Sequence, residues 1–318
     1  MRGTLSDFSP ITKTAQVQAC FRRSVIGFRS ARDAFRVLLT ACGITTGDSI
    51  LLPSFIGWSA GEGSGVYDPV ASIGAEPIFY RMNENLSIDA DDVQCKIRMR
   101  KPRVLVLIHY FGYPDPNAAA LAAYAHKHGV LVLEDEAHAM LSDLVGGACG
   151  RTGDAAIFSL HKMLPFREGG VLLLNPSIAD GVRMQLAERE PQGELLSFWE
   201  YDLHCIATIR RRNAEQLIAA LPALAGRVNL LFPSLPPGVV PQTLPVIIQR
   251  KNRDELYFEM NAAGFGVVSL YHTLIDRVNA KEFPESHTLA SRIMNLPVHQ
   301  DAKPEQLAAM IDKLRELA

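Results

Sequence analysis

Two short apolar runs enclose a helical stretch in the middle of the chain, and this arrangement constrains the fold most strongly. Residues 104 to 108 form a continuous apolar run, Asp115 and Pro116 are typical of a helix start, and an alanine-rich stretch ends at Gly129. A second apolar run covers residues 130 to 133. The pattern predicts a β-α-β unit whose two strands are parallel, adjacent and covered on both faces.

Further apolar segments extend this unit into a large α/β domain. Apolar side chains recur at helical spacing over residues 31 to 42, and Gly43 is a plausible C-cap. Short buried strands are expected on both sides of the β-α-β unit, at 50 to 52, 77 to 80, 155 to 159 and 171 to 174. We therefore expect residues 1 to 200 to form a large α/β domain.

The last third of the chain has a different texture. It contains a predicted helix at 209 to 221, a proline-rich connector, a predicted strand at 246 to 249 and a predicted helix at 254 to 263. After Pro304, apolar residues share one helical face, which is typical of a helix that docks on a core. We expect residues 201 to 318 to form a smaller α+β domain.

Charge and composition exclude several classes of partner and site. The net charge of -2 over 318 residues offers no basic field for a nucleic acid. The first residues lack the apolar core of a signal peptide, and no run of about 18 apolar residues predicts a membrane span. Neither a disulfide framework nor a zinc site is expected, and a reducing cytoplasm fits best, because the cysteines are odd in number and lack a CxxC spacing. They are Cys20, Cys42, Cys95, Cys149 and Cys205.

An acid and a lysine follow two of the predicted strands. Asp135 lies directly after the strand at 130 to 133, and ligands of open α/β sheets bind at the carboxyl ends of strands. Lys162 follows the strand at 155 to 159. Enzymes that use pyridoxal 5'-phosphate (PLP) need a lysine that links to the cofactor and an acid that faces the pyridine nitrogen. The alternatives are a loop-capping aspartate and a solvated lysine.

Several ordered motifs, from Ser30 to the C-terminal helix, resemble one known family. The motifs are SARDAFRVLLTACGITTGDSILLPSF, LEDEAHA, and GRTGDAAIFSLHK followed by EGG. They are similar to those of the DegT/StrS group of PLP-dependent sugar aminotransferases, which have the fold type I architecture of the aspartate-aminotransferase superfamily. The resemblance implies a large domain with a mixed, mostly parallel sheet and a smaller α+β domain.

The resemblance also implies roles for individual residues. Lys162 would carry the cofactor, Asp135 would face the ring nitrogen and His138 would lie near the ring hydroxyl. The other positions that match cofactor-binding sites of the family are Arg32, Asp33, Ser159 and His161 for the phosphate and Trp58 for the ring. Structural readings stay open: a satisfied histidine for His138, ordinary strand-end hydrogen bonds for Ser159 and His161, and core packing for Trp58.

Three features depart from the family pattern. Lys162 stands three residues after Ser159, where the family commonly has five. Residues 61 to 68 form an insertion, and its glycines predict a loop that is mobile or that approaches the cofactor. The stretch from 193 to 212 lacks the asparagine motif with which a neighbouring subunit usually touches the phosphate. The arginines at 210 to 212 could replace that contact, or they could form a solvated helix face.

The expected activity is the transfer of an amino group, from glutamate by resemblance, to a keto-sugar nucleotide in surface-polysaccharide or secondary-metabolite biosynthesis. The expected assembly is a homodimer. One alternative is a PLP-dependent sugar dehydratase, a relative in which histidine replaces the lysine, so that Lys162 argues against it. The other alternative is a PLP-binding regulatory protein without turnover, which the missing asparagine motif would suit.

Overall fold

A seven-stranded mixed sheet forms the centre of the computed structural model, which describes residues 23–187 and 193–318. Its strand order is β1-β7-β6-β5-β4-β2-β3, and β7 runs antiparallel to both of its neighbours, whereas the other neighbouring pairs are parallel. The mixed, mostly parallel sheet expected from the sequence is confirmed. The strands are β1 (Ser24–Phe28), β2 (Ser49–Pro53), β3 (Glu76–Tyr80), β4 (Val104–Ile108), β5 (Leu131–Asp135), β6 (Ala155–Ser159) and β7 (Gly170–Leu174).

The predicted β-α-β unit is present. Strands β4 and β5 pair in parallel, with Ile108 opposite Asp135, and helix α4 (Ala118–Lys127) connects them. Every residue of β4 is buried, as expected of a strand covered on both faces. The helix starts two residues later than Pro116 predicts, and the Asp115 carboxylate accepts hydrogen bonds from the backbone N–H groups of Ile88 and Asn117.

The helices of the first two hundred residues pack around this sheet. Helix α1 begins after Ser30, whose hydroxyl accepts a hydrogen bond from the Asp33 N–H, and it packs against β6 and β7. Its C-cap is Cys42, and Gly43 follows with a φ of 70°. The remaining elements are α2 (Tyr67–Ser72), α3 (Ala90–Arg100), α5 (Met140–Leu144), α6 (Asp180–Ala187) and three short 3-10 helices, η1 (Tyr110–Gly112), η2 (Leu160–Lys162) and η3 (Gly193–Glu200), with α1 itself spanning Ala31–Ala41.

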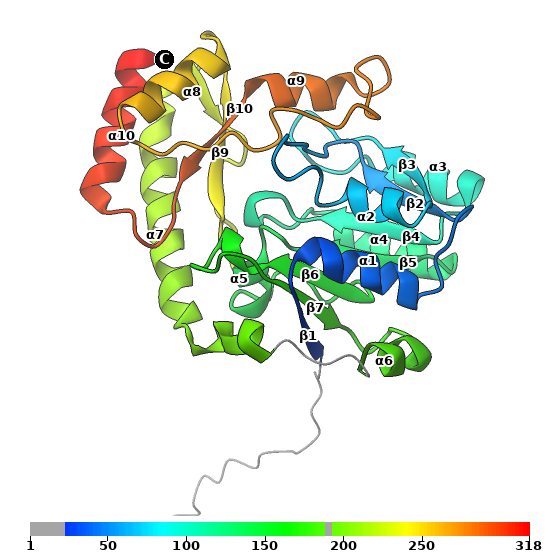
Figure 1. The fold of residues 1–318 in the computed structure, drawn as a ribbon. Helices are drawn as coiled ribbons and strands as arrows, with labels where there is room; N and C mark the ends of the chain where they lie inside the picture. The colour runs from blue at the N-terminus through cyan, green and yellow to red at the C-terminus, as the bar shows by residue number, and fades with distance from the viewer. Residues whose placement is uncertain (1–22, 188–192) are drawn as a thin grey trace, which may run out of the picture.

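A second, antiparallel sheet with the order β10-β9-β8 lies in the last third of the chain. Its strands bury a separate apolar cluster together with α7, α8 and α10. Figure 1 shows this sheet and these three helices on one side of the molecule and the large sheet on the other. The elements are α7 (Leu203–Ala220), η4 (Leu221–Leu224), β8 (Val228–Leu230), β9 (Thr243–Ile248), α8 (Arg253–Ala262), α9 (Pro284–Arg292), β10 (Ile293–Pro297) and α10 (Pro304–Leu317).

A division into two domains near residue 200 stays a prediction. No helix among the described residues has the length and apolarity that a membrane span requires. The N-terminal stretch considered for a signal peptide, together with Cys20, lies outside the described residues.

Candidate active site

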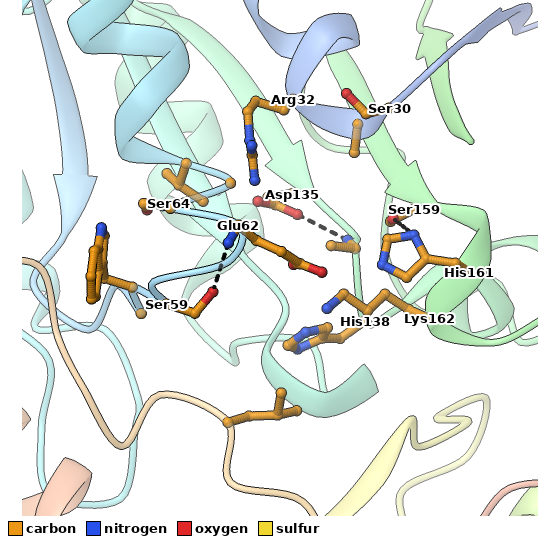
Figure 2. A pocket seen from close by; sticks show the side chains of 18 of the residues that line it. Ser30, Arg32, Ser59, Glu62, Ser64, Asp135, His138, Ser159, His161 and Lys162 are labelled. Atoms are coloured by element: carbon orange, nitrogen blue, oxygen red, sulfur yellow. Dashed lines mark hydrogen bonds between the residues drawn. The ribbon is translucent and has the colours of Figure 1, made fainter. Parts of the chain in front are cut away.

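A cleft of about 690 Å³ opens at the carboxyl ends of the parallel strands. Segments far apart in the sequence line it: the start of α1, the loop after β2, the ends of β5 and β6, and residues 269 to 272. Figure 2 shows Arg32, Asp135, His138 and Lys162 around this space. Of the eight site residues predicted from the sequence, Asp33 does not line the cleft. The seven that do line it are Arg32, Trp58, Asp135, His138, Ser159, His161 and Lys162.

Asp135 is the last residue of β5 and is 6% exposed. Its Oδ1 accepts a hydrogen bond of 2.9 Å from the Ala137 N–H. Burial raises the pKa of Asp135 to about 6, against the opposing effects of that hydrogen bond and of the charges on His109 and Lys162. A cationic N–H group placed against this carboxyl would favour its charged form.

His138 follows three residues after Asp135 and is 4% exposed. Its ring stacks on Phe111, with centroids 5.7 Å apart, and its Nδ1 accepts a hydrogen bond of 3.3 Å from the Phe111 N–H. Burial, and then the charges of Lys162 and His161, lower the pKa of His138 to about 3. The ring is therefore neutral near pH 7, with the proton on Nε2, where it can donate to an oxygen in the cleft.

Lys162 ends the 3-10 turn η2, directly after β6. Its ammonium points toward His138 in Figure 2. At the end of β6, Ser159 is 5% exposed, and its hydroxyl lies 3.1 Å from His161 Nδ1. Strands β5 and β6 are parallel neighbours, with Asp135 opposite Ile157, so the acid and the lysine reach the same cleft.

The N-terminus of α1 forms another wall of the cleft. Arg32 lines the cleft, and its Nε is buried without a hydrogen-bond partner in the part of the chain that the structure describes. The Asp33 carboxylate accepts a hydrogen bond of 2.9 Å from the Ser30 hydroxyl, so it is engaged at the helix cap. Free N–H groups of the first helical turn, together with the helix dipole, suit an anion at this end of the cleft.

Gly170, the first residue of β7, lies against the start of α1. A Cβ at this position would be 2.1 Å from the backbone carbonyl carbon of Ser30 and 2.2 Å from the backbone nitrogen of Ala31. Both contacts are with backbone, which cannot move aside as the end of a side chain can. The Glu-Gly-Gly motif after Lys162 thus lets the helix start approach the sheet closely.

We expect Gly170→Ala to lower the free energy of unfolding by about 1–3 kcal/mol, the usual effect of overpacking. The measurement is the free energy of unfolding in urea. Gly181→Ala in α6 is the matched control, because no heavy atom lies within 4 Å of its added Cβ. A Gly170→Ala protein as stable as the control would show that the helix start does not depend on this contact.

The loop after β2 lines the cleft with Trp58, which the sequence assigned to the site, and with residues of the insertion, for which the sequence predicted no individual roles. Residues 61 and 63 to 66 of the insertion line the cleft, together with Glu62, whose side chain projects into it in Figure 2. Trp58 lines the cleft and is 47% exposed. Tyr271 also lines the cleft and has a φ of 59°, an uncommon conformation for a bulky residue. The place of Tyr271 in the cleft could not be predicted from its backbone conformation, because a strained conformation has no residue pattern of its own.

The arginines at 210 to 212 are engaged within their own chain. Arg210 is 3% exposed and donates hydrogen bonds to Gln300 and to the carbonyls of Gln242 and Met163. A solvated helix face is therefore wrong for Arg210. Burial lowers its pKa to about 10. None of the three arginines lines the cleft of this chain.

Comparison with models of known protein families shows to which family the chain belongs. The model of the DegT/DnrJ/EryC1/StrS aminotransferase family matches residues 17–187 and 202–315. The chain belongs to this family. Lys162 and Asp135 of this DegT/DnrJ/EryC1/StrS aminotransferase both line the cleft.

Individual relatives agree with this assignment. The chain is 25% identical to a dTDP-3-amino-3,4,6-trideoxy-alpha-D-glucose transaminase of Streptomyces venezuelae, over 94% of this chain and 84% of the relative. Its fold is similar to that of a putative sugar aminotransferase of Streptococcus pneumoniae in its PLP form, with a TM-score of 0.76, 15% identity and coverage of 92% and 86%. A GDP-4-keto-6-deoxy-D-mannose-3-dehydratase of E. coli with bound hydrated PLP is also similar, with a TM-score of 0.70, 15% identity and coverage of 91% and 86%.

Proposed function

We propose that this DegT/DnrJ/EryC1/StrS aminotransferase binds PLP in the cleft and transfers an amino group from glutamate to a keto-sugar nucleotide. The observation that carries the proposal is the meeting of Lys162 and Asp135 in one cleft that begins at a helix N-terminus. The names of the relatives support a sugar nucleotide as the acceptor, with a role in surface-polysaccharide or secondary-metabolite biosynthesis.

The donor groups of the cleft fit PLP. The cofactor has an anionic phosphate, an aldehyde, a ring hydroxyl and a basic ring nitrogen. Each finds a partner of suitable chemistry: the N-terminus of α1 and Arg32 for the phosphate, Lys162 for the aldehyde, His138 for the hydroxyl and Asp135 for the nitrogen. The Nε of Arg32, buried without a partner among the described residues, is the kind of donor that an anion would satisfy.

The remaining predicted residues have supporting roles in this proposal. Ser159 and His161 would add hydrogen bonds to the phosphate, and Trp58 would cover one face of the ring. Asp33 would act indirectly, by holding the start of α1 in place, because its carboxylate accepts a hydrogen bond from the Ser30 hydroxyl there.

The protein's residues divide the work of the reaction. When bound, PLP supplies an electron sink that stabilises negative charge on the substrate carbon. Asp135 would keep a positive charge on the ring nitrogen, because its carboxylate would accept a hydrogen bond from the protonated nitrogen. Lys162 would hold the cofactor at rest and, once released, would take the proton from the substrate carbon of glutamate and later give a proton to the sugar carbon that is aminated.

A change in cofactor absorbance on mixing with glutamate is the first test. We expect the purified protein, loaded with PLP, to change its visible absorbance and to release one equivalent of 2-oxoglutarate per chain. Adding a panel of keto-sugar nucleotides to the glutamate-treated protein should then restore the original spectrum for the true acceptor. A PLP-loaded protein that glutamate leaves unchanged would instead support a binding protein without turnover.

The dehydratase alternative has less support. In that relative histidine replaces the lysine, and here Lys162 itself lines the cleft. We further propose that the chain works as a homodimer in the cytoplasm on small molecules, without a nucleic-acid or membrane partner. The net charge of -2 supports the absence of a nucleic-acid partner. The homodimer is supported by the resemblance to a family that builds its cleft at a subunit interface.

A further inference from the structure

A second cluster of polar side chains lies at the end of β5, outside the cleft. It contains His109, Glu134, Glu136 and Cys149, which are all buried, with 6% exposure at most. Glu134 and Glu136 flank Asp135, so alternation along the chain directs them away from the side to which Asp135 points. His109 follows β4, and Cys149 lies in the loop after α5. None of the four is among the residues that line the cleft.

Glu134 fixes the ring of His109. Its Oε2 lies 2.7 Å from His109 Nε2, and its two oxygens also accept hydrogen bonds from the backbone N–H groups of Gly150, Thr152 and Gly153. A carboxylate can only accept hydrogen bonds, so the neutral form of His109 donates from Nε2 to Glu134 and keeps a lone pair on Nδ1.

Within residues 23–187 and 193–318, that Nδ1 is buried and has no hydrogen-bond partner. A carboxylate on one ring nitrogen is the arrangement that orients a metal-binding histidine and leaves its other nitrogen available. The pairing of His109 with Glu134 therefore has the form of a metal ligand with its supporting acid.

Glu136 is the second unsatisfied group of the cluster. Its side chain is fully buried, and neither carboxylate oxygen has a hydrogen-bond partner among the described residues. The neighbouring Asp143 already has a counter-ion, since Arg23 donates two hydrogen bonds to its carboxylate. A carboxyl group that is buried without a hydrogen-bond partner is costly, and a cation beside Glu136 would remove this cost.

The space next to Glu136 is kept open by a glycine. Gly150 has a φ of 80°, and a Cβ there would lie 2.5 Å from Glu136 Oε1. The thiol of its neighbour Cys149 lies in the same region, where it donates a hydrogen bond of 3.9 Å to the carbonyl oxygen of Ala139. One ligand atom each of His109, Glu136 and Cys149 lie within 4.8 Å of one another. A tetrahedral zinc ion holds its ligand atoms roughly 3.3–3.8 Å apart, so a small movement of side chains would complete the site.

We propose that His109, Glu136 and Cys149 bind a divalent zinc ion. Thiolate, imidazole and carboxylate together form a zinc ligand set, with a fourth position left for water, and the two anionic ligands neutralise the ion. The ion would join the loop after α5 to the ends of β4 and β5, directly behind Asp135. Such a site would contradict the expectation, drawn from cysteine spacing, that the chain has no zinc site. The proposal does not depend on the proposed transferase reaction.

Zinc content of the full-length chain, with any affinity tag removed, tests the proposal. The protein is stripped with a chelator, incubated with zinc sulfate, desalted and measured by mass spectrometry of the metal. We expect about one zinc per chain in the wild type and binding weakened at least about tenfold in Cys149→Ser and Glu136→Gln. Cys42→Ser is the matched control, because Cys42 is a partly buried cysteine away from the cluster and should leave zinc binding unchanged.

Cobalt provides a second measurement that needs no variant to fold. Wild-type protein loaded with Co²⁺ should show an intense near-ultraviolet band of thiolate-to-metal charge transfer, and the band should persist in Cys42→Ser. A wild type that retains no stoichiometric zinc, or that shows no such cobalt band, would overturn the proposal. Equal zinc content in the wild type and in a folded Cys149→Ser protein would overturn it as well.

Discussion

Lys162→Ala should abolish turnover, with a loss of about 10⁴-fold or more, while the protein still folds. The large effect is expected because one side chain both holds the cofactor and moves the proton at the substrate carbon. Lys162 is only partly buried in the cleft wall, so its removal should cost little stability. Visible absorbance of the PLP-loaded protein measures cofactor attachment, and release of 2-oxoglutarate from glutamate measures turnover.

Two controls separate chemistry from folding in this experiment. Lys127→Ala removes an exposed lysine of α4 and should retain both activity and absorbance. A small primary amine added to Lys162→Ala should restore part of the turnover, because it replaces the missing base. Borohydride treatment of the wild type should fix the cofactor on the peptide that contains Lys162. Full activity in Lys162→Ala, or cofactor fixed to another peptide, would refute the assignment.

Asp135→Asn should lower kcat by about 10²–10³-fold, the range found when one preorganised electrostatic group is removed. Asparagine keeps the shape of the side chain but cannot hold a positive charge on the ring nitrogen. The internal link to Lys162 should still form, so that the PLP-loaded variant keeps visible absorbance. Steady-state kinetics with glutamate as donor provides the measurement.

Asp91→Asn, on the exposed face of α3, is the matched control and should keep the wild-type kcat. If Asp135→Asn turns over as fast as this control, the carboxylate does not tune the cofactor, and the reading of β5 as the cofactor-facing strand fails.

The central strands could be predicted because they are buried on both faces. Strands β4 to β7 each contain an apolar run, and the boundaries of β4 and β6 agree with the prediction to the residue. Helices α1 and α10 were also predictable, since each has a well-defined apolar stripe that packs on a core. In these segments the local pattern and the tertiary environment demand the same residues.

Elements with weaker patterns were missed for identifiable reasons. Helix α3 buries only Val93 and Ile97 and otherwise shows charged residues to solvent, so it has little periodicity. Strand β10 contains Asn295, whose Oδ1 accepts a hydrogen bond from Thr243 within the small sheet. A buried polar residue with a distant partner cannot be distinguished from a loop residue by sequence alone.

The cleft could be predicted only in part. Asp135 and Lys162 follow strands, and parallel neighbouring strands end at the same edge of a sheet, so their meeting follows from topology. Glu62 and Tyr271 belong to connecting segments whose path depends on the whole fold. The cluster of His109, Glu136 and Cys149 is assembled across 40 residues without a motif, which is why cysteine spacing gave no indication of it.

Strand β1 has a consequence for how the chain reaches its native state. It pairs with β7, so that Ser24 lies opposite Leu174 although about 150 residues separate them. During synthesis, the first strand therefore has no partner until the lysine turn and the strand after it have left the ribosome. Contacts of such long sequence separation slow folding, and the pocket around Lys162 should consequently be among the last regions of the nascent enzyme to become ordered.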